Sequence, residues 1–301
     1  MRTGTTFVTT LMLFVCIELI DPSASSAQSK HRRTSTRQPT VKPTATATPQ
    51  PTATPGGVSF SDSFNVDETI EEAGSMAESS SPDWWVNSGG RFIKGGGAGH
   101  TIHGDLPAND RWRIAYAQSN PVDTDDGYHP QNIFRLVTRT RWKNFDQQVH
   151  FRIDRINMST SPNRNASNGV LLFNRYQDSQ TLYYAGVRVD GAAVIKKKVA
   201  GKYTTMAHGG IFPGYGTYNV TNKPNLIPEN QWIGIRTLVT TNPDGSVDVQ
   251  LLVDQGSGWN VALDAVDTGA TGGAEVTADG YGGIRTDFMD ADFENYSIAE
   301  H

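Results

Sequence analysis

Short segments rich in Val, Ile, Tyr, Phe and Thr recur from residue 58 to the C-terminus, with Gly, Asn, Asp and Pro between them. β-branched and aromatic residues favour strands, and the intervening residues favour tight turns. Apart from residues 66–77, which could form a short helix, this region has no apolar stripe with helical spacing. The pattern predicts an all-β fold, a sandwich of two antiparallel sheets. The clearest strands are predicted at residues 133–142, 148–156, 170–176, 182–189, 193–199, 232–240, 247–253 and 293–298.

Two sequences with strong turn propensity join pairs of these strands. An Asp-Gly pair at residues 190–191 separates the fourth and fifth predicted strands, and Asn-Pro-Asp-Gly at residues 242–245 separates the sixth and seventh. Asp, Asn and Gly tolerate the positive φ that hairpin turns require. Both connections are therefore predicted to be antiparallel hairpins.

Successive side chains of a strand point to opposite faces, so the apolar residues predict which face is inward. Val149, Phe151 and Ile153 mark the inward face of one strand, and Tyr183 and Ile195 mark those of two others. The remaining positions of these strands carry polar, charged and small side chains. The residues predicted to face outward are Gln148, His150, Arg152, Asp154, Tyr184, Gly186, Arg188, Asp190, Lys196 and Lys198.

Charge is sorted along the chain. Residues 132–203 contain thirteen Lys and Arg against four Asp and no Glu, although residues 58–301 together have a net charge of −9. Clustered charge of one sign attracts a partner of the other sign. If the strands of the basic segment are neighbours, one sheet carries a wall of cations interleaved with Tyr and His, and its partner is an anion. The alternative is an ordinary solvated face, which every two-sheet sandwich has on its outside.

The first 57 residues differ in composition from the rest. Arg2, an apolar stretch at residues 7–20 and small residues up to Ala27 are typical of a signal peptide, which we predict at residues 1–27. The stretch is shorter than the ~20 residues of a membrane helix and contains Glu18, so no membrane span is predicted. Residues 28–57 are rich in Thr and Pro, a composition that predicts a disordered linker or an extended stalk. The expected protein is secreted or displayed at the cell surface, as a monomer with one domain at residues 58–301.

The single cysteine, Cys16, lies inside the predicted signal peptide. A mature domain without cysteine has no disulfide, no thiol nucleophile and no thiolate metal site. Nucleic acid is another polyanion that strands with basic and aromatic residues bind. We do not predict a nucleic acid partner, because the domain is acidic as a whole and is expected to be secreted.

Three segments carry a resemblance to a known superfamily. They are Phe-Ser-Asp-Ser-Phe at residues 60–64, Gly-Ile-Arg-Thr-Asp at 283–287 and a closing strand at 291–298. With the strands and turns in this order, residues 58–301 resemble the concanavalin A-like lectin/glucanase sandwiches, which have two antiparallel sheets in jelly-roll order. The resemblance implies that the first and last strands pair. Lectins, binding modules, glycoside hydrolases and polysaccharide lyases all belong to that superfamily, so it also implies a carbohydrate ligand.

Hydrolases and lyases of this fold need different side chains. Glycoside hydrolysis uses paired carboxylates, and no Glu-x-Asp-x-x-Glu cluster is present. Alginate lyases of this fold show Gln-(Ile/Val)-His after an Arg-rich strand and before a Lys-Ala-Gly-x-Tyr segment. Here Gln-Val-His at residues 148–150 follows an Arg-rich strand, and Ala-Gly-Lys-Tyr follows at 200–203. The Arg strand lacks the interposed Glu, the Lys is displaced to Lys198, and Thr205 replaces the expected Gln.

The resemblance implies a polysaccharide lyase that cleaves a uronate-containing, anionic polysaccharide by β-elimination. A cation neutralises the sugar carboxylate while a base and an acid transfer protons. The candidate catalytic residues are Gln148, His150, Tyr184 and Tyr203. The candidate substrate-binding residues are Arg135, Arg139, Arg152, Arg175, Arg188, Lys196 and Lys198. A non-catalytic lectin-like module that uses the same wall and a structural cell-surface domain without a ligand are the alternatives, so enzymatic activity stays open.

No cofactor is required for this chemistry, but structural Ca²⁺ is an additional hypothesis. Asp62, Asp290 and Asp292 are the candidate ligands, and the acidic loop at residues 123–126 offers further oxygen atoms. His100 and His103 could also bind a metal ion, although the sequence suggests no third ligand for them.

Tryptophans have two interpretations in such a sandwich. They can stack on sugar rings, or they can seal the ends between the two sheets. The residues concerned are Trp84, Trp85, Trp112 and Trp259.

Overall fold

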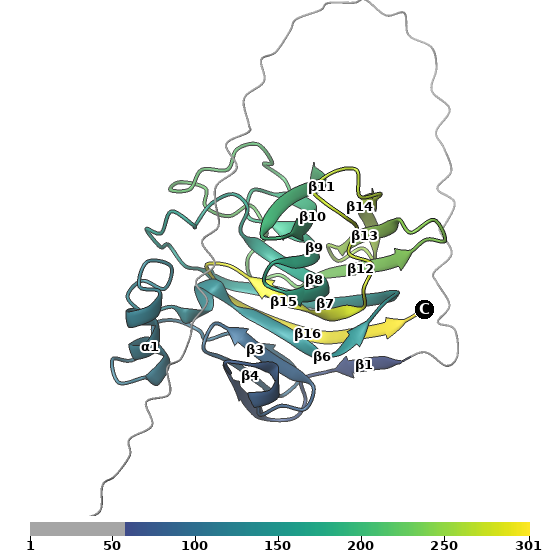
Figure 1. Ribbon diagram of the computed structural model, residues 1–301. Coiled ribbons are helices and arrows are strands. Elements are labelled where there is room, and N and C mark those ends of the chain that lie inside the picture. Colours follow the sequence, from purple (N-terminus) through teal and green to yellow (C-terminus); the bar gives the residue numbers. More distant parts are fainter. Residues whose placement is uncertain (1–57) are drawn as a thin grey trace, which may run out of the picture.

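The computed structural model describes residues 58–301; the predicted signal peptide and linker lie outside the described residues. The described chain forms two antiparallel sheets packed face to face, with a helical insertion at one end (Figure 1). The predicted all-β sandwich is therefore confirmed. No helix in residues 58–301 is long and apolar enough to cross a membrane.

Nine strands form one sheet, which we call sheet A. Their order is β14-β13-β12-β7-β16-β5-β4-β2, and β1 also pairs with β16. The first strand thus pairs with the last, as the resemblance to concanavalin A-like sandwiches implied. The strands of sheet A are β1 (Ser59–Asp62), β2 (Glu68–Glu71), β4 (Arg91–Gly95), β5 (Ala98–His100), β7 (Phe145–Ile156), β12 (Ile233–Thr241), β13 (Val247–Asp254), β14 (Asn260–Asp267) and β16 (Met289–Glu300).

Seven strands form the second sheet, sheet B, in the order β11-β10-β9-β8-β15-β6-β3. Both predicted hairpins are present: β9 turns into β10 and β12 turns into β13. All eight predicted strands are found. The strands of sheet B are β3 (Trp84–Ser88), β6 (Arg135–Trp142), β8 (Gly169–Asp178), β9 (Thr181–Arg188), β10 (Ala192–Val199), β11 (Lys202–Gly210) and β15 (Gly280–Thr286).

The helical prediction for residues 66–77 is wrong. This segment forms β2, whose Ile70 is buried, and a 3₁₀ turn at Met76–Glu78. The α-helix of the domain is α1 (Arg111–Ser119), and a second 3₁₀ turn covers Pro130–Ile133. Asp110 caps α1 by accepting a hydrogen bond from the backbone N of Trp112 at 2.8 Å. The helix buries only Trp112 and Tyr116, so its sequence has no apolar stripe to reveal it.

The core lies between the sheets, and strand alternation builds it. Val149, Phe151 and Ile153 are fully buried, as predicted, and so are Tyr183 and Ile195. They belong to one continuous apolar cluster with side chains from both sheets. Three aromatic residues pack together beside this cluster, and the ring of Trp84 lies edge-on to the rings of Phe60 and Tyr296. The ring centroid of Trp84 lies 5.4 Å from that of Phe60 and 4.7 Å from that of Tyr296.

A second apolar cluster lies on the other side of sheet B, facing away from the core. It consists of Val137, Leu171, Phe173, Tyr176, Leu182, Tyr184 and Val194. Sheet B is therefore apolar on both faces, which is unusual for an outer sheet in a sandwich. This outer face carries a groove.

Candidate functional site

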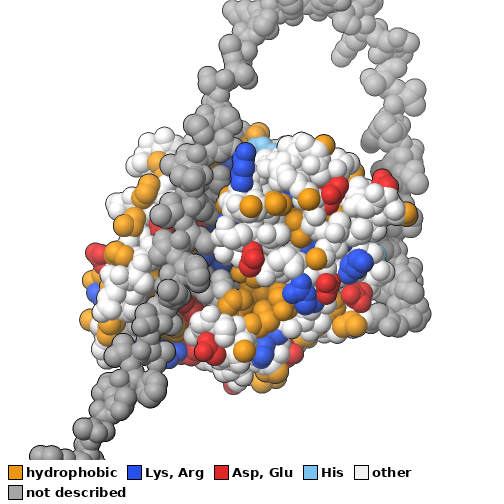
Figure 2. All heavy atoms as spheres, in the orientation of Figure 1, with side chains coloured by type: hydrophobic (Ala, Val, Ile, Leu, Met, Phe, Trp, Pro, Cys, Tyr) orange, Lys and Arg blue, Asp and Glu red, His pale blue; other side chains and the backbone are white. Residues whose placement is uncertain are grey.

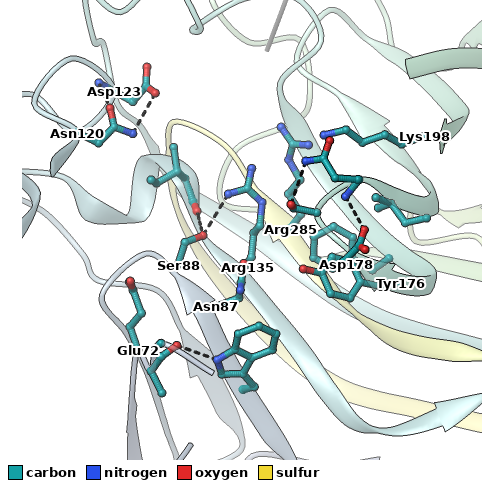
Figure 3. A pocket seen from close by; sticks show the side chains of 18 of the residues that line it. Glu72, Asn87, Ser88, Asn120, Asp123, Arg135, Tyr176, Asp178, Lys198 and Arg285 are labelled. Atoms are coloured by element: carbon teal, nitrogen blue, oxygen red, sulfur yellow. Dashed lines mark hydrogen bonds between the residues drawn. The ribbon is translucent and has the colours of Figure 1, made fainter. Parts of the chain in front are cut away.

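A groove of about 470 Å³ runs over the outer face of sheet B. Strands contribute its base, and the segment after β2, helix α1 and the loop after α1 contribute one wall. Figure 3 shows Arg135 and Arg285 between Ser88 and Asn87 on one side and Asp178 and Lys198 on the other. Its lining includes Glu72, Trp85, Asn87, Ser88, Trp112, Tyr116, Asn120, Asp123, Arg135, Phe173, Tyr176, Asp178, Gln180, Leu182, Lys198, Tyr203 and Arg285.

Two arginines occupy neighbouring strands at the centre of the groove. Arg135 on β6 and Arg285 on β15 are directly opposite each other in the ladder. Like charges at such a position repel. The charge of Arg285 is compensated by Asp287. The Oδ1 of Asp287 lies 3.0 Å from both the Nε and the Nη2 of Arg285. Arg135 donates one hydrogen bond to the hydroxyl of Ser88 at 3.2 Å and, within residues 58–301, has no carboxylate at ion-pair distance.

A lysine and a tyrosine form the opposite end of the groove. The Nζ of Lys198 lies 3.1 Å from the hydroxyl of Tyr203 and 4.3 Å from its ring centroid. Lys198 is only 5% exposed, and no ion pair compensates it among the described residues. The ring of Tyr203 packs edge-on against Tyr184, at a centroid distance of 5.6 Å. A largely desolvated ammonium group therefore borders the groove.

Glu72 is a carboxylate in the opposite wall. Its Oε2 accepts hydrogen bonds from the hydroxyl of Tyr116 at 2.6 Å and from the backbone N of Gly90 at 2.8 Å. Burial raises the pKa of Glu72 above its ordinary value, although these hydrogen bonds and the charge of Arg135 act in the opposite direction. The pKa of Tyr116 is raised for the same main reason, its burial.

Two further carboxylates line the groove. Asp178, at the turn between β8 and β9, accepts a hydrogen bond from the backbone N of Gln180 at 2.7 Å. Asp123 accepts hydrogen bonds from Ser161 at 2.6 Å and Asn163 at 3.0 Å. The groove thus combines cations at its centre and one end with carboxylates in its walls.

The predicted site residues do not form a single wall. Arg135, Lys198 and Tyr203 line the groove, and Tyr184 and Lys196 lie on the same face of sheet B beside Tyr203. Gln148, His150 and Arg152 lie on β7, which belongs to sheet A. Since their side chains alternate with buried core residues, they point away from sheet B. The expectation that these groups share one surface is therefore corrected: no single sugar ring can contact both sets.

On sheet A, His150 packs against an aromatic residue and does not face the groove. Its ring packs against Trp259, at a centroid distance of 5.5 Å, and its Nδ1 is buried with no hydrogen-bond partner among the described residues. Gln148 lies beside Arg236 on β12. The Gln-Val-His sequence thus has a different neighbourhood from the one that the lyase resemblance implied.

Three predicted substrate-binding arginines bind the protein itself. Arg175 is fully buried, and its guanidinium donates to Lys143 O at 2.8 Å and to Val276 O at 2.9 Å. Arg188 forms an ion pair with Asp190 at 2.7 Å. Arg139 donates to the backbone carbonyl of Ser81. None of the three lines the groove.

The basic segment is neutralised in part by acids from elsewhere in the sequence. Figure 2 shows Lys, Arg, Asp and Glu side chains mixed around a hydrophobic patch on the face that is in view. Antiparallel pairing places some basic strands beside acidic C-terminal ones, and Arg141, Arg152, Arg155 and Lys197 pair with carboxylates there. The cross-segment ion pairs are Arg141–Asp279, Arg152–Asp292, Arg155–Asp290, Arg155–Asp105 and Lys197–Asp267.

Lys197 forms one of these ion pairs while fully buried. It points into the core, where its Nζ lies 2.7 Å from Asp267 Oδ1 and 2.7 Å from Gly273 O. The hydroxyl of Tyr183 donates to the other carboxylate oxygen at 2.6 Å, and burial raises the pKa of Tyr183. This buried trio ties β9 and β10 to β14 across the sandwich, so it stabilises the fold rather than a ligand.

The predicted calcium ligands do not converge. Asp62 binds Trp84 Nε1 and Lys94 Nζ, both at 2.9 Å. Asp290 accepts hydrogen bonds from Gln131, Asn157 and Gly104 and pairs with Arg155, while Asp292 pairs with Arg152 and His103. Across residues 58–301, no group of three or more His, Cys, Asp or Glu side chains could hold a metal ion.

The histidine pair of the sequence is also accounted for by protein contacts. The rings of His100 and His103 are 4.8 Å apart. Asp292 lies 3.2 Å from His103 Nε2 and raises the pKa of that histidine, while His100 Nδ1 lies 2.7 Å from Thr101 O.

Several groove residues were not among the predicted site residues. Trp84 and Trp85 were considered together, yet alternation sends Trp84 into the core and Trp85 into the groove. Arg285 was noted only as part of a fold motif. Glu72 and Asp178 have no local signal, because the segments around them come together only in the folded chain.

Comparisons with known proteins found similar solved structures only. No protein-family model matches this chain, and no curated protein matches it. Similar solved structures include the carbohydrate binding module CBM66 from Bacillus subtilis (14% identity, 55% of this chain and 81% of that one, TM-score 0.38). Others are the GH43 protein BlXynB from Bacillus licheniformis (12%, 80% and 39%, TM-score 0.41) and LamAcat from Zobellia galactanivorans (9%, 80% and 96%, TM-score 0.41). At TM-scores below 0.5 these similarities assign no function to this chain.

Proposed function

We propose that this protein binds an anionic, uronate-containing polysaccharide in the groove over sheet B, outside the cell. The observation that carries the proposal is the pair of groove cations, Arg135 and Lys198, neither of which forms an ion pair with a carboxylate of residues 58–301. A partly desolvated cation gains most from an anionic partner that it can hydrogen-bond. Two such cations at separate positions in one groove suit a polymer with a carboxylate on successive sugars.

The groove also offers the apolar surface that sugar rings need. Trp85, Tyr176 and Tyr203 line it, and the apolar cluster on the outer face of sheet B underlies it. Aromatic faces pack well against the C–H faces of sugars, while their polar groups remain available for hydrogen bonds. The two classes of contact together favour a carbohydrate over a small anion.

Cleavage by β-elimination is a second candidate function, favoured by the contact between Lys198 and Tyr203. In this reaction Arg135 neutralises the sugar carboxylate, which makes the C5 proton easier to remove. In its phenolate form Tyr203, at the end of the groove beside Lys198, accepts that proton. The C4–O bond then breaks, a C4=C5 double bond forms, and the hydroxyl of Tyr203 returns the proton to the leaving oxygen. His150 has no part in this scheme, since it lies on sheet A. The proposal requires no metal ion.

The test is to measure affinity for alginate, polyglucuronate and polygalacturonate in the parent protein and in Arg135→Ala, Lys198→Ala and Lys202→Ala variants. We expect the first two variants to bind at least about tenfold more weakly, because each loses a hydrogen-bonded charge contact. Lys202 is exposed and outside the groove, so its variant is the matched control. Equal affinity of all four proteins, or no binding of any polyuronate, would overturn the proposal.

The same samples distinguish binding from cleavage. A growing ultraviolet absorbance of the new conjugated double bond would demonstrate elimination. Tyr203→Phe is then expected to abolish this absorbance and to retain the affinity, because only the hydroxyl is removed. Affinity without any absorbance change in the parent protein would identify a lectin-like binding module.

A further inference from the structure

The outer face of sheet A carries two partly exposed tryptophans side by side. Trp232 directly precedes β12, and its ring lies 5.2 Å from the guanidinium carbon of Arg152 on β7. Two residues further along β12, Gly234 lies opposite His150. Trp259 covers this glycine, and its indole packs on His150. Positions two apart on a strand are about 7 Å apart, so the two indoles lie next to each other.

The chain is built to hold Trp259 there. It follows a loop after β13 in which the carboxylate of Asp254 accepts hydrogen bonds from Gly256 N at 2.7 Å and Gly258 N at 2.9 Å. Both glycines have a positive φ, as such a tight turn requires. A Cβ on Gly234 would lie 2.6 Å from the Trp259 ring. A glycine at this position therefore allows the indole to lie directly on the backbone of the sheet.

The arginine beside the two rings has a carboxylate partner, and Glu294 lies opposite His150 in the ladder. Arg152 pairs with Asp292, and Asp292 also contacts His103. No unpaired cation of the kind found in the groove is present beside these rings within the described chain. This surface therefore differs from the groove on the opposite sheet: it has aromatic faces and hydrogen-bonding groups, but no excess positive charge.

We infer that Trp232 and Trp259 form a second carbohydrate-binding surface, which takes a neutral polysaccharide. Two adjacent indole faces suit consecutive sugar rings of one chain, and the partly exposed guanidinium of Arg152 supplies a polar contact. The lack of surplus positive charge disfavours an anionic ligand, so a neutral chain is the better match. Because this surface and the groove are on opposite sheets, one molecule binds a neutral chain and an anionic chain at the same time.

Affinity electrophoresis in gels containing hydroxyethylcellulose, galactomannan or arabinoxylan tests this inference. We expect at least one of these neutral polymers to retard the parent protein. The Trp232→Ala/Trp259→Ala variant should lose at least about tenfold in affinity, and Trp259→Phe, which keeps an aromatic face, should lose less. Tyr215→Ala removes an exposed aromatic residue elsewhere and serves as the matched control.

The groove provides the check on folding and on independence. The double tryptophan variant should retain the polyuronate affinity of the parent, and Arg135→Ala should retain the affinity for the neutral polymer. The inference is overturned if none of the three neutral polymers retards the parent protein, or if retardation survives the double substitution. Failure of polyuronate binding would instead overturn the function proposed for the groove and leave the result with neutral polymers intact.

Discussion

At the scale of single residues, the fold changes the pKa of one carboxyl group, that of Glu72. It is held at the groove by Tyr116 and Gly90. Burial raises its pKa above the ordinary 4.5. The folded protein therefore binds this proton more tightly than the unfolded chain does. The resulting contribution to stability is complete below about pH 4.5 and is lost as the pH rises through the folded pKa.

We therefore expect Glu72→Gln to gain stability relative to the parent as the pH rises from about 4 to about 8. Glutamine can still accept both hydrogen bonds, but it carries no charge to desolvate. Urea denaturation at several pH values measures the difference in unfolding free energy. Glu78→Gln, at an exposed position, controls for the loss of one negative charge. A difference between Glu72→Gln and the parent that does not change with pH would contradict the shift.

Residue-level prediction from sequence succeeds where only neighbouring positions matter. Alternation correctly turns Lys196 and Lys198 to one face of β10 and Ile195 to the other. It also separates Trp84 from Trp85. The environment of Glu72 could not be predicted, because its partners Gly90 and Tyr116 lie 18 and 44 residues away in sequence.

At the scale of elements, strand β15 depends on an irregularity near the middle of sheet B. Its pairing with β6 and with β8 shifts register between Tyr281 and Gly283, which is the signature of a bulge. Beyond this bulge, Arg285 lies opposite Arg135 at the centre of the groove. The position of the two arginines thus depends on the backbone of this one strand.

The bulge requires glycine at position 283. The φ of Gly283 is +149°, and a Cβ there would lie 2.2 Å from Leu136 O. We expect Gly283→Ala to lower the free energy of unfolding by at least about 2 kcal/mol, through backbone strain and overpacking. In Gly209→Ala the nearest atom, on Leu263, would be 3.6 Å away, so this control should change stability by less than about 1 kcal/mol. Urea denaturation compares the two, and equal effects would refute the argument.

Prediction of elements was accurate where the strands are long and bounded by strong turns. The eight predicted strands all lie in the part of the domain from Arg135 onward. Strands β1 to β5, β11, β14 and β15 and helix α1 were missed. The three to five residues of β1 to β5 contain too little periodicity, and α1 buries only two side chains. These missed elements provide one wall of the groove, including Glu72 and Trp85.

At the scale of the whole molecule, the sorted charge of the sequence becomes mixed in space. β16, from the acidic C-terminal part, pairs with β7 from the basic segment, and this brings Asp292 beside Arg152. Which strands become neighbours, and in which sheet, is decided by contacts distant in sequence. The sandwich was therefore predictable from local patterns, while the division of the basic residues between two sheets was not.

The same long-range pairing includes the first described strand. β1 closes the fold by pairing from Ser59 with Ala299 to Asp62 with Tyr296. Phe60 and Phe64 pack against Trp84, and Asp62 accepts a hydrogen bond from its indole. A chain that starts at residue 58 retains all of these contacts, whereas one that starts at residue 66 loses them.

We expect residues 58–301 to melt within about 2 °C of the full-length protein. Residues 66–301 should melt at least roughly 10 °C lower, or fail to fold. The buried Phe64 and the partly buried Phe60 are removed, together worth several kcal/mol, and in a domain of this size 1 kcal/mol shifts the melting temperature by about 2–4 °C. Circular dichroism during heating measures the melting temperature of both chains. Equal melting temperatures would mean that β1 does not hold the last strand in place; a low value for residues 58–301 would place the boundary earlier in the chain.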